Sequence, residues 1–255
     1  MGVSKTDYMR GLQCPKMLWL DKHKPEMRMI PPHIQQRLDE GNAFGDKAMG
    51  MFGPFVEVDV RDEEGAPDYL GRIQKTKELI EAHTPVVCEA AFSYYGCYCA
   101  VDLLRKVRYG YEIYEVKNSD SVKPQFIKDV GFQAWVAEYC GVSVMKCFIV
   151  LPKKNEVGER IDGEYEIVDV TDEAVAFAKQ VNQHIWRLAK IKKQTREVEV
   201  PMGEHCNEPY ECWYKRYCEV YWFEKKDKEA EEAAMAEVQR LLEEHKRKKQ
   251  EGEQT

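Results

Sequence analysis

Three consecutive apolar and β-branched runs, separated by two glycines, constrain the fold of this chain more than any other feature. The runs are VVCEAAFSYY, CYCAVDLLRKV and YEIYEVKN, and Gly96 and Gly110 stand between them. Glycines between strand-like runs are typical of tight turns. We therefore predict an antiparallel meander of three strands between residues 86 and 118.

A helical stretch and a further strand follow the meander. Residues 123–141 are predicted to form a helix that ends at Gly141, and residues 142–152 a buried strand. A helix that crosses between two strands indicates a right-handed parallel unit. Further helices are expected over four other stretches, namely residues 4–20, 33–52, 70–83 and 169–193. The predicted fold class is α/β, with a mixed central sheet flanked by helices.

Composition and charge narrow the classes of function. The 255 residues are 44% apolar and 33% charged, with a formal net charge of −7, so the molecule as a whole does not attract nucleic acid. Binding to phosphate would need local basic patches or metal ions. No stretch approaches about 18 consecutive apolar residues, and the N-terminus lacks an apolar leader core. We therefore expect a cytoplasmic protein without membrane contact.

Acidic residues of the predicted meander can converge on one face of the sheet. Residues two apart in a strand point the same way, so Glu115 and Lys117 share a face, and Asp102 lies on the neighbouring strand. Glu89 on the first strand is a plausible fourth member. Crowded carboxylates repel one another unless a divalent cation lies among them, and hard oxygen ligands favour Mg²⁺ or Mn²⁺. The alternative is an exposed ion pair between Glu115 and Lys117 on an edge strand.

In this order and spacing, Asp102, the EVK triplet at 115–117 and Gln133 resemble the PD-(D/E)XK nuclease superfamily, and within it the RecB-like branch. The resemblance implies a restriction-endonuclease-like fold and metal-dependent hydrolysis of phosphodiester bonds. It assigns metal binding to Asp102, Glu115 and the Val116 carbonyl. It assigns Lys117 the role of catalytic base or water orienter, and Gln133 a contact with DNA or with Lys117.

The first long helix lacks the His that many RecB-like enzymes carry there. A metal ligand from that helix would be Asp46 or Asn42 here, and otherwise Glu89 would take over. Asp129 lies one helical turn before Gln133 and so shares its face.

Nine cysteines in a chain expected in a reducing compartment favour metal ligation or burial over disulfides. Three of them, Cys206, Cys212 and Cys218, are spaced C-x5-C-x5-C, which is wider than in zinc knuckles or ribbons. Cys14 is the leading candidate for a fourth ligand. Five others lie among apolar or β-prone residues and are predicted to be small core residues: Cys88, Cys97, Cys99, Cys140 and Cys147.

One early cysteine and three late ones resemble the iron–sulfur RecB-like exonucleases, which include CRISPR-associated nucleases of the Cas-four type and the AddB nuclease domain. The resemblance covers about residues 3–220. It implies a structural [4Fe–4S] cluster that clasps the chain ends, held by Cys14, Cys206, Cys212 and Cys218. The alternatives are zinc on the same thiolates, zinc with His205 in place of one thiolate, and plain burial of the cysteines.

Single-stranded DNA or DNA ends are the substrate that the resemblance implies, for an exonuclease that works with a helicase or a CRISPR-type adaptation partner. Near the N-terminus, Lys5, Arg10 and Lys16 are interleaved with Tyr8 and Trp19, which suits phosphate binding and base stacking. The second hypothesis is a catalytically weakened module that keeps the nuclease fold and binds DNA ends or a protein partner.

We predict four segments along the chain. Residues 1–32 supply the first cluster cysteine, and residues 33–198 form the nuclease core. Residues 199–223 carry the three late cysteines, and residues 224–255 form an exposed charged helix. That tail either recruits a partner or keeps the protein soluble.

Overall fold

A computed structural model describes residues 2–252 of the chain, which divides into two units. The first unit comprises Met1–Pro25 and Ile30–Val200, and the second comprises Glu26–Met29 and Pro201–Thr255. All the residues of the candidate active site belong to the first unit.

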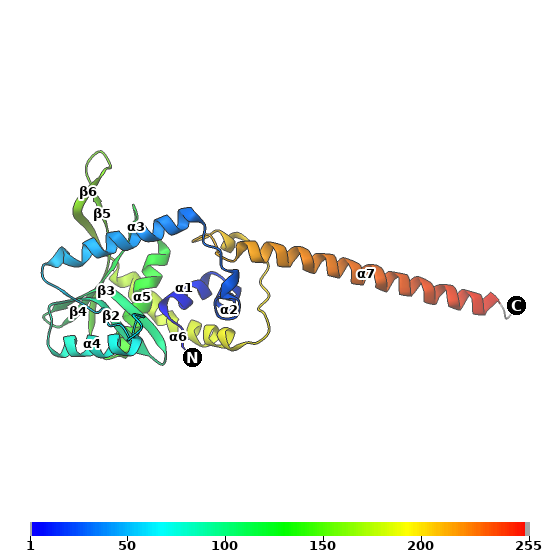
Figure 1. The fold of residues 1–255 in the computed structure, drawn as a ribbon, viewed down its shortest axis with the longest axis horizontal. Coiled ribbons are helices and arrows are strands. Elements are labelled where there is room, and N and C mark those ends of the chain that lie inside the picture. The colour runs from blue at the N-terminus through cyan, green and yellow to red at the C-terminus, as the bar shows by residue number, and fades with distance from the viewer. Residues whose placement is uncertain (1, 253–255) are drawn as a thin grey trace. The chain divides into compact units, whose positions relative to one another are not determined.

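The first unit is built on a six-stranded mixed sheet whose strands lie side by side in chain order (Figure 1). β2 (Val86–Tyr94), β3 (Cys97–Val107) and β4 (Gly110–Val116) form the predicted antiparallel meander. β5 (Val144–Lys154) pairs with β4 in parallel, as the predicted helical crossover requires. β1 (Val56–Glu57) pairs with β2 in parallel, and β6 (Arg160–Asp169) pairs with β5 in antiparallel fashion at the other edge.

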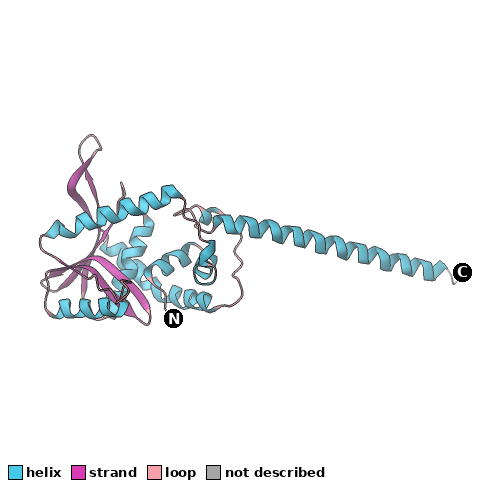
Figure 2. Cartoon of the chain, viewed as in Figure 1, coloured by secondary structure: helices cyan, strands magenta, loops and turns pink. Residues whose placement is uncertain are grey.

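Helices flank this sheet, so the predicted α/β class with a mixed central sheet is confirmed (Figure 2). α5 (Pro124–Tyr139) contacts β2, β3, β4 and β5, and α6 (Thr171–Lys193) packs on α5. α1 (Lys5–Gln13) packs on both of these helices, and α2 (Pro15–His23) packs on α6. α3 (Pro32–Ala48) contacts β4 and β6, whereas α4 (Tyr69–Glu81) contacts β2. Short 3-10 turns occupy Pro25–Met27, Met49–Phe52 and Glu204–Cys206.

The alternation of side chains along β4 places Tyr114 and Glu115 on opposite faces of the sheet. Tyr114 and Val116 are buried in an apolar cluster with Leu103 and with Ala48 of α3. Glu115 therefore points to the other face, which α5 covers.

Two features of the first unit differ from the sequence prediction. No strand is predicted at 160–169, because the side chains of β6 are mostly exposed and the apolar alternation of a half-buried strand is missing. Cys88, Cys97, Cys99 and Cys147 are buried as predicted, whereas Cys140 is exposed at the end of α5. Its place at a helix terminus, followed by the turn at Gly141, removes it from the core.

The second unit consists mainly of α7 (Lys215–Gly252), preceded by irregular chain around the late cysteines. The helix begins at Lys215, earlier than the tail predicted from residue 224, so it includes Cys218. Residues 253–255 of the predicted tail lie outside the described residues. Among the helices of the described chain, none combines the length and the apolar character that a bilayer span needs.

Candidate active site

Three acidic residues meet where the pairing between the central strands is interrupted. The β3–β4 pairing runs from Val107 opposite Gly110 to Leu103 opposite Tyr114, one position short of Asp102 and Glu115. The β2–β3 pairing keeps one register on both sides of Glu89, which places Glu89 opposite Asp102. Carboxylates from β2, β3 and β4 thus lie at one level of the sheet.

The Asp102 carboxylate fills the gap between β3 and β4. Its Oδ2 accepts a hydrogen bond of 2.7 Å from the backbone N–H of Val116. The N–H and C=O of one strand residue point to the same side, so the Val116 carbonyl also lies on the Asp102 side. Burial raises the pKa of Asp102, although the ammonium groups of Lys5 and Lys117 lower it in part. Asp102 is therefore held in place by the backbone of the strand that carries Glu115.

Glu115 lies at the centre of the site and is only 1% exposed. Its carboxylate accepts hydrogen bonds from Lys117 Nζ at 2.5 Å, from Lys5 Nζ at 3.3 Å and from Gln133 Nε2. Burial, with repulsion from Asp102 and Asp129, outweighs the two ammonium groups and raises the pKa of Glu115 to about 7. A cation that binds Glu115 would therefore stabilise the ionised form of this carboxylate.

Asp129 completes the polar contacts on the α5 side. It lies one turn before Gln133, and its carboxylate is 2.7 Å from Lys117 Nζ and 3.4 Å from Lys5 Nζ. Burial alone would raise the pKa of Asp129, but the two ammonium groups outweigh burial and hold this pKa well below its usual range. Asp129 thus stays ionised and holds the ammonium of Lys117 between α5 and β4.

Lys5 reaches this site from the start of the chain, which sequence reasoning did not foresee. The sequence suggests a phosphate contact near the N-terminus, whereas the structure places the Lys5 ammonium between Glu115 and Asp129. The sequence does predict that Lys5 and Tyr8 share a helix face. It holds no signal that this face docks on α5.

Glu89 has an unusual backbone conformation beside the site. Its φ is +54°, which costs an ordinary residue about 1–2 kcal/mol, and the strand pairing on both sides holds it there. Burial raises the pKa of Glu89, and the ammonium of Lys5 offsets this in part. Strained positions of this kind gather at functional sites. We refer to Lys5, Glu89, Asp102, Glu115, Lys117 and Asp129 together as the acid–base cluster.

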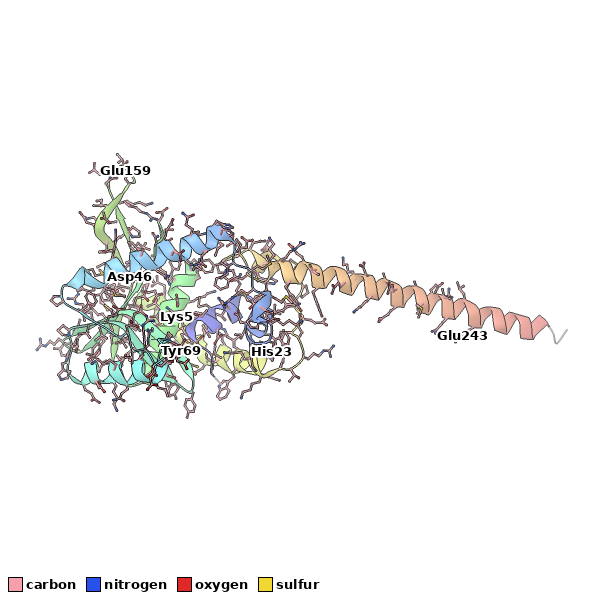
Figure 3. All side chains as sticks on the ribbon, in the orientation of Figure 1. Lys5, His23, Asp46, Tyr69, Glu159 and Glu243 are labelled. Atoms are coloured by element: carbon pink, nitrogen blue, oxygen red, sulfur yellow. The ribbon has the colours of Figure 1, made fainter. Side chains whose placement is uncertain are left out.

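Other predicted site residues lie elsewhere. Asp46 is exposed on α3, and no hydrogen bond or ion pair among the described residues joins it to the acid–base cluster (Figure 3). Lys16 is 3% exposed and pairs with Glu197 at 2.9 Å. Arg10 pairs with Asp21 at 2.7 Å. These two cations are therefore engaged within the first unit rather than displayed for phosphate binding.

The acid–base cluster has donors that fit a hard divalent cation. Among the described residues, no three His, Cys, Asp or Glu side chains are grouped closely enough to hold a metal ion, and two ammonium groups contact the carboxylates of the acid–base cluster. Yet Gln133 Oε1 is buried and accepts no hydrogen bond within the described chain, and the buried Asp129 Oδ1 lies 3.4 Å from the Lys5 ammonium. Carboxylate, amide and carbonyl oxygens are the ligands that Mg²⁺ and Mn²⁺ prefer. The donor set therefore fits the predicted cation.

The late cysteines lie in the second unit. The backbone N–H of Cys212 donates to the carbonyl of Cys206 at 2.9 Å, and the N–H of Cys218 donates to Tyr214 at 3.0 Å. These bonds fold the wide C-x5-C spacing back on itself, so Cys206 and Cys212 are neighbours. Cys14 belongs to the first unit, between α1 and α2. Its role as a fourth ligand stays a prediction.

Comparison with known proteins adds little to this picture. No family model matches the chain, and no curated protein matches it. Among solved structures, the crystal structure of an alkaline exonuclease from Laribacter hongkongensis is similar over 46% of this chain and 66% of that chain. The identity is 16% and the TM-score is 0.26. The likeness spans just under two thirds of the exonuclease, and at this TM-score it assigns no function to the chain.

Proposed function

We propose that this chain is a metal-dependent nuclease that hydrolyses phosphodiester bonds in DNA. One observation carries the proposal: Asp102, Glu115 and Lys117, from two neighbouring strands, converge on the α5 face with Gln133 bound to Glu115. Two carboxylates and an ammonium in this order suit attack of water on a phosphorus centre. Single-stranded DNA and release of nucleotides from an end are the finer form of the proposal, and they rest on the sequence resemblance.

Different residues of the site would have different roles in this reaction. Asp102, Glu115, Glu89 and the Val116 carbonyl would hold Mg²⁺ or Mn²⁺, which polarises a phosphoryl oxygen and lowers the pKa of a bound water. Gln133 and Asp129 fix Glu115 and Lys117 from α5. The water would lose a proton to solvent as its oxygen bonds to phosphorus, the bond from phosphorus to the leaving oxygen would break, and that oxygen would take up a proton from solvent.

Lys117 acts in this scheme as a cation rather than as a base. Burial alone would lower its pKa, but the carboxylates of Asp129 and Glu115 outweigh burial and raise the pKa above its usual value. A protonated Lys117 donates hydrogen bonds to the attacking water or to an oxygen of the reacting phosphate. It thereby neutralises the charge that develops on the phosphoryl oxygens.

The experiment compares wild type with Lys117→Ala on end-labelled single-stranded DNA in the presence of Mn²⁺. We expect cleavage by wild type and a loss on the order of a hundredfold to a thousandfold in the variant. Lys154→Ala, which removes an exposed ammonium from β5, is the matched control and should cleave normally. An inert wild type that still binds the DNA would contradict the nuclease and favour the weakened binding module. Comparing cleavage of linear and circular single-stranded DNA then distinguishes an exonuclease, which needs a DNA end, from an endonuclease, which does not.

We also propose that the late cysteines bind a [4Fe–4S] cluster, with Cys14 as the fourth ligand. The hydrogen bond from the backbone N–H of Cys212 to the carbonyl of Cys206 supports their joint use, because it brings the backbones of two cysteines of the motif together. The visible absorbance of anaerobically purified protein and its iron and sulfide content test this. If the protein were colourless and contained stoichiometric zinc, zinc rather than an iron–sulfur cluster would be the bound metal. Cys212→Ser should lower the metal content in either case.

A further inference from the structure

The position of Lys5 is fixed by more contacts than its place near the chain terminus suggests. Ser4 caps α1, since its Oγ accepts from the N–H of Asp7 at 3.1 Å while Asp7 Oδ2 accepts from the N–H of Ser4 at 3.0 Å. One turn after Lys5, Tyr8 is fully buried and stacks on Phe132 of α5 with ring centroids 4.6 Å apart. Phe132 precedes Gln133, so the helix that supplies Asp129 and Gln133 also fixes α1.

The segment before α1 is anchored as well. A Cβ on Gly2 would stand 1.5 Å from the Gly96 carbonyl oxygen, so Gly2 lies directly against the β2–β3 turn. Lys192 of α6 donates to the Gly2 carbonyl at 3.1 Å and to Asp7 at 2.7 Å. These contacts aim the Lys5 side chain at the acid–base cluster.

The Lys5 ammonium contacts two of the four carboxylates of the acid–base cluster directly. It lies 3.3 Å from the Glu115 carboxylate and 3.4 Å from the Asp129 carboxylate. Lys117 contacts the same two carboxylates, at 2.5 Å and 2.7 Å. Lys5 is therefore as central to the cluster as the lysine that sequence reasoning identified.

The formal charges explain what a second ammonium achieves. With all groups ionised, four carboxylates and two ammonium groups leave −2, which one divalent cation cancels. Without Lys5 the same site would keep one negative charge after metal binding and would repel an anionic phosphodiester. The Lys5 side chain is 23% exposed, as is that of Lys117, so its ammonium can still reach a ligand.

We infer that Lys5 is a second active-site ammonium that tunes the charge of the site: it weakens binding of the divalent cation and strengthens binding of the DNA phosphate. The inference rests on the proposed function. It differs from a purely structural role, which would support both ligands, and from an outlying phosphate contact, which would leave the cation unaffected.

Lys5→Met tests the inference through two binding measurements with opposite expected signs. Calorimetric titration of metal-free protein with Mn²⁺ at pH 8 should show affinity rising on the order of tenfold, because a unit of positive charge is removed. Protons compete with Mn²⁺ for the same carboxylates. Removal of Lys5 strengthens proton binding less than Mn²⁺ binding, because Mn²⁺ carries twice the charge. Fluorescence anisotropy of a labelled oligothymidylate, with Ca²⁺ in place of Mn²⁺, should show DNA affinity falling by a similar factor.

Two further variants make the result specific. Lys5→Arg keeps the charge and should restore both affinities to near the wild-type values. Lys192→Met removes the contacts that aim Lys5, so it should shift both affinities in the same directions as Lys5→Met, by a smaller factor. Circular dichroism checks folding, and Lys5→Gln replaces Lys5→Met if the latter unfolds.

Each other outcome overturns the inference. Weaker binding of both ligands by Lys5→Met would show a structural role, and unchanged Mn²⁺ affinity with weaker DNA binding would show a peripheral contact. The Mn²⁺ titration needs no catalysis. If wild type cleaves no DNA, the nuclease proposal fails while the place of Lys5 in the cation site is still decided.

Discussion

Glu115 and Asp120 lie five positions apart in the chain, and the groups of acidic and basic side chains around them differ in almost every physical respect. Glu115 lies in β4 and Lys117 directly follows that strand, both inside the acid–base cluster, where Glu115 is 1% exposed. Asp120, in the loop that follows, pairs with Lys154 at 3.0 Å and Arg160 at 3.1 Å, with its own side chain 63% exposed. We refer to Asp120, Lys154 and Arg160 as the surface cluster.

The pKa directions show what burial changes. Hydrogen bonds from Lys154 and Arg160 lower the pKa of Asp120, as expected of a solvated ion pair. In the acid–base cluster, burial raises the pKa of Glu115 to about 7 despite two nearby ammonium groups. Water and salt screen the surface cluster, whereas the ionised form of the buried Glu115 is not fully stabilised by the positive charge around it. Similar residue types thus form an ion pair in one place and a candidate cation site in the other.

The largest effect should follow from Asp102→Asn. The amide oxygen still accepts the hydrogen bond from Val116, so the variant loses charge but keeps geometry. We expect cleavage of single-stranded DNA to fall on the order of a thousandfold. The free energy of unfolding should not fall, because burial disfavours the lost carboxylate charge. Parallel activity assays and urea titrations measure both, and retained activity would remove Asp102 from the site.

Asp129→Asn should have the next largest effect, on stability. Asp129 is buried and pairs with Lys117 and Lys5, so its loss leaves those ammonium groups short of a partner. We expect the free energy of unfolding at pH 7 to fall by about 3 kcal/mol, measured by urea titration. The folded pKa of Asp129 lies below its unfolded value, so the contribution is present above about pH 4 and is lost as acid is added. A variant as stable as wild type at pH 7 would contradict this.

The fold follows from the sequence where local signals and packing agree. Gly96 and Gly110 mark the turns of the meander, and the helix at Pro124–Tyr139 between two buried strands specifies a parallel crossover. β6 escapes prediction because its pairing with β5 is made by backbone hydrogen bonds that side-chain patterning does not report. An exposed edge strand of this kind can be predicted only after the strand that it pairs with has been identified.

The candidate site is predictable only in part, for a similar reason. A period of two places Glu115 and Lys117 on one face, and a period of 3.6 places Asp129 beside Gln133. Neither period relates Lys5 to a residue 110 positions away, since that contact depends on how α1 docks on α5. Lys16 shows the converse case. Its sequence setting suits a phosphate contact, but tertiary packing buries it against Glu197.

Cation binding should depend on pH in the acid–base cluster. The folded pKa of Glu115 is about 7, so below that pH a proton must leave before the carboxylate can hold a cation. Mn²⁺ affinity of the metal-free protein should rise about tenfold per pH unit up to pH 7 and level off above it. Calorimetry in buffers of different ionisation enthalpy counts the protons released. An affinity independent of pH from below 6 to above 7 would contradict the raised pKa.

The smallest effect should follow from Asp120→Asn, and it sets the baseline for the comparison. Lys154 and Arg160 are themselves 35% and 47% exposed, so water can replace the lost carboxylate at both. Activity, Mn²⁺ affinity and the urea midpoint should all match wild type, and added salt should remove any residual difference. Arg160 also donates to Asn118 at 2.6 Å, so the loop keeps a second attachment to β6. A tenfold loss of activity would mean that this loop shapes the site, and the contrast between the two clusters would then be one of degree.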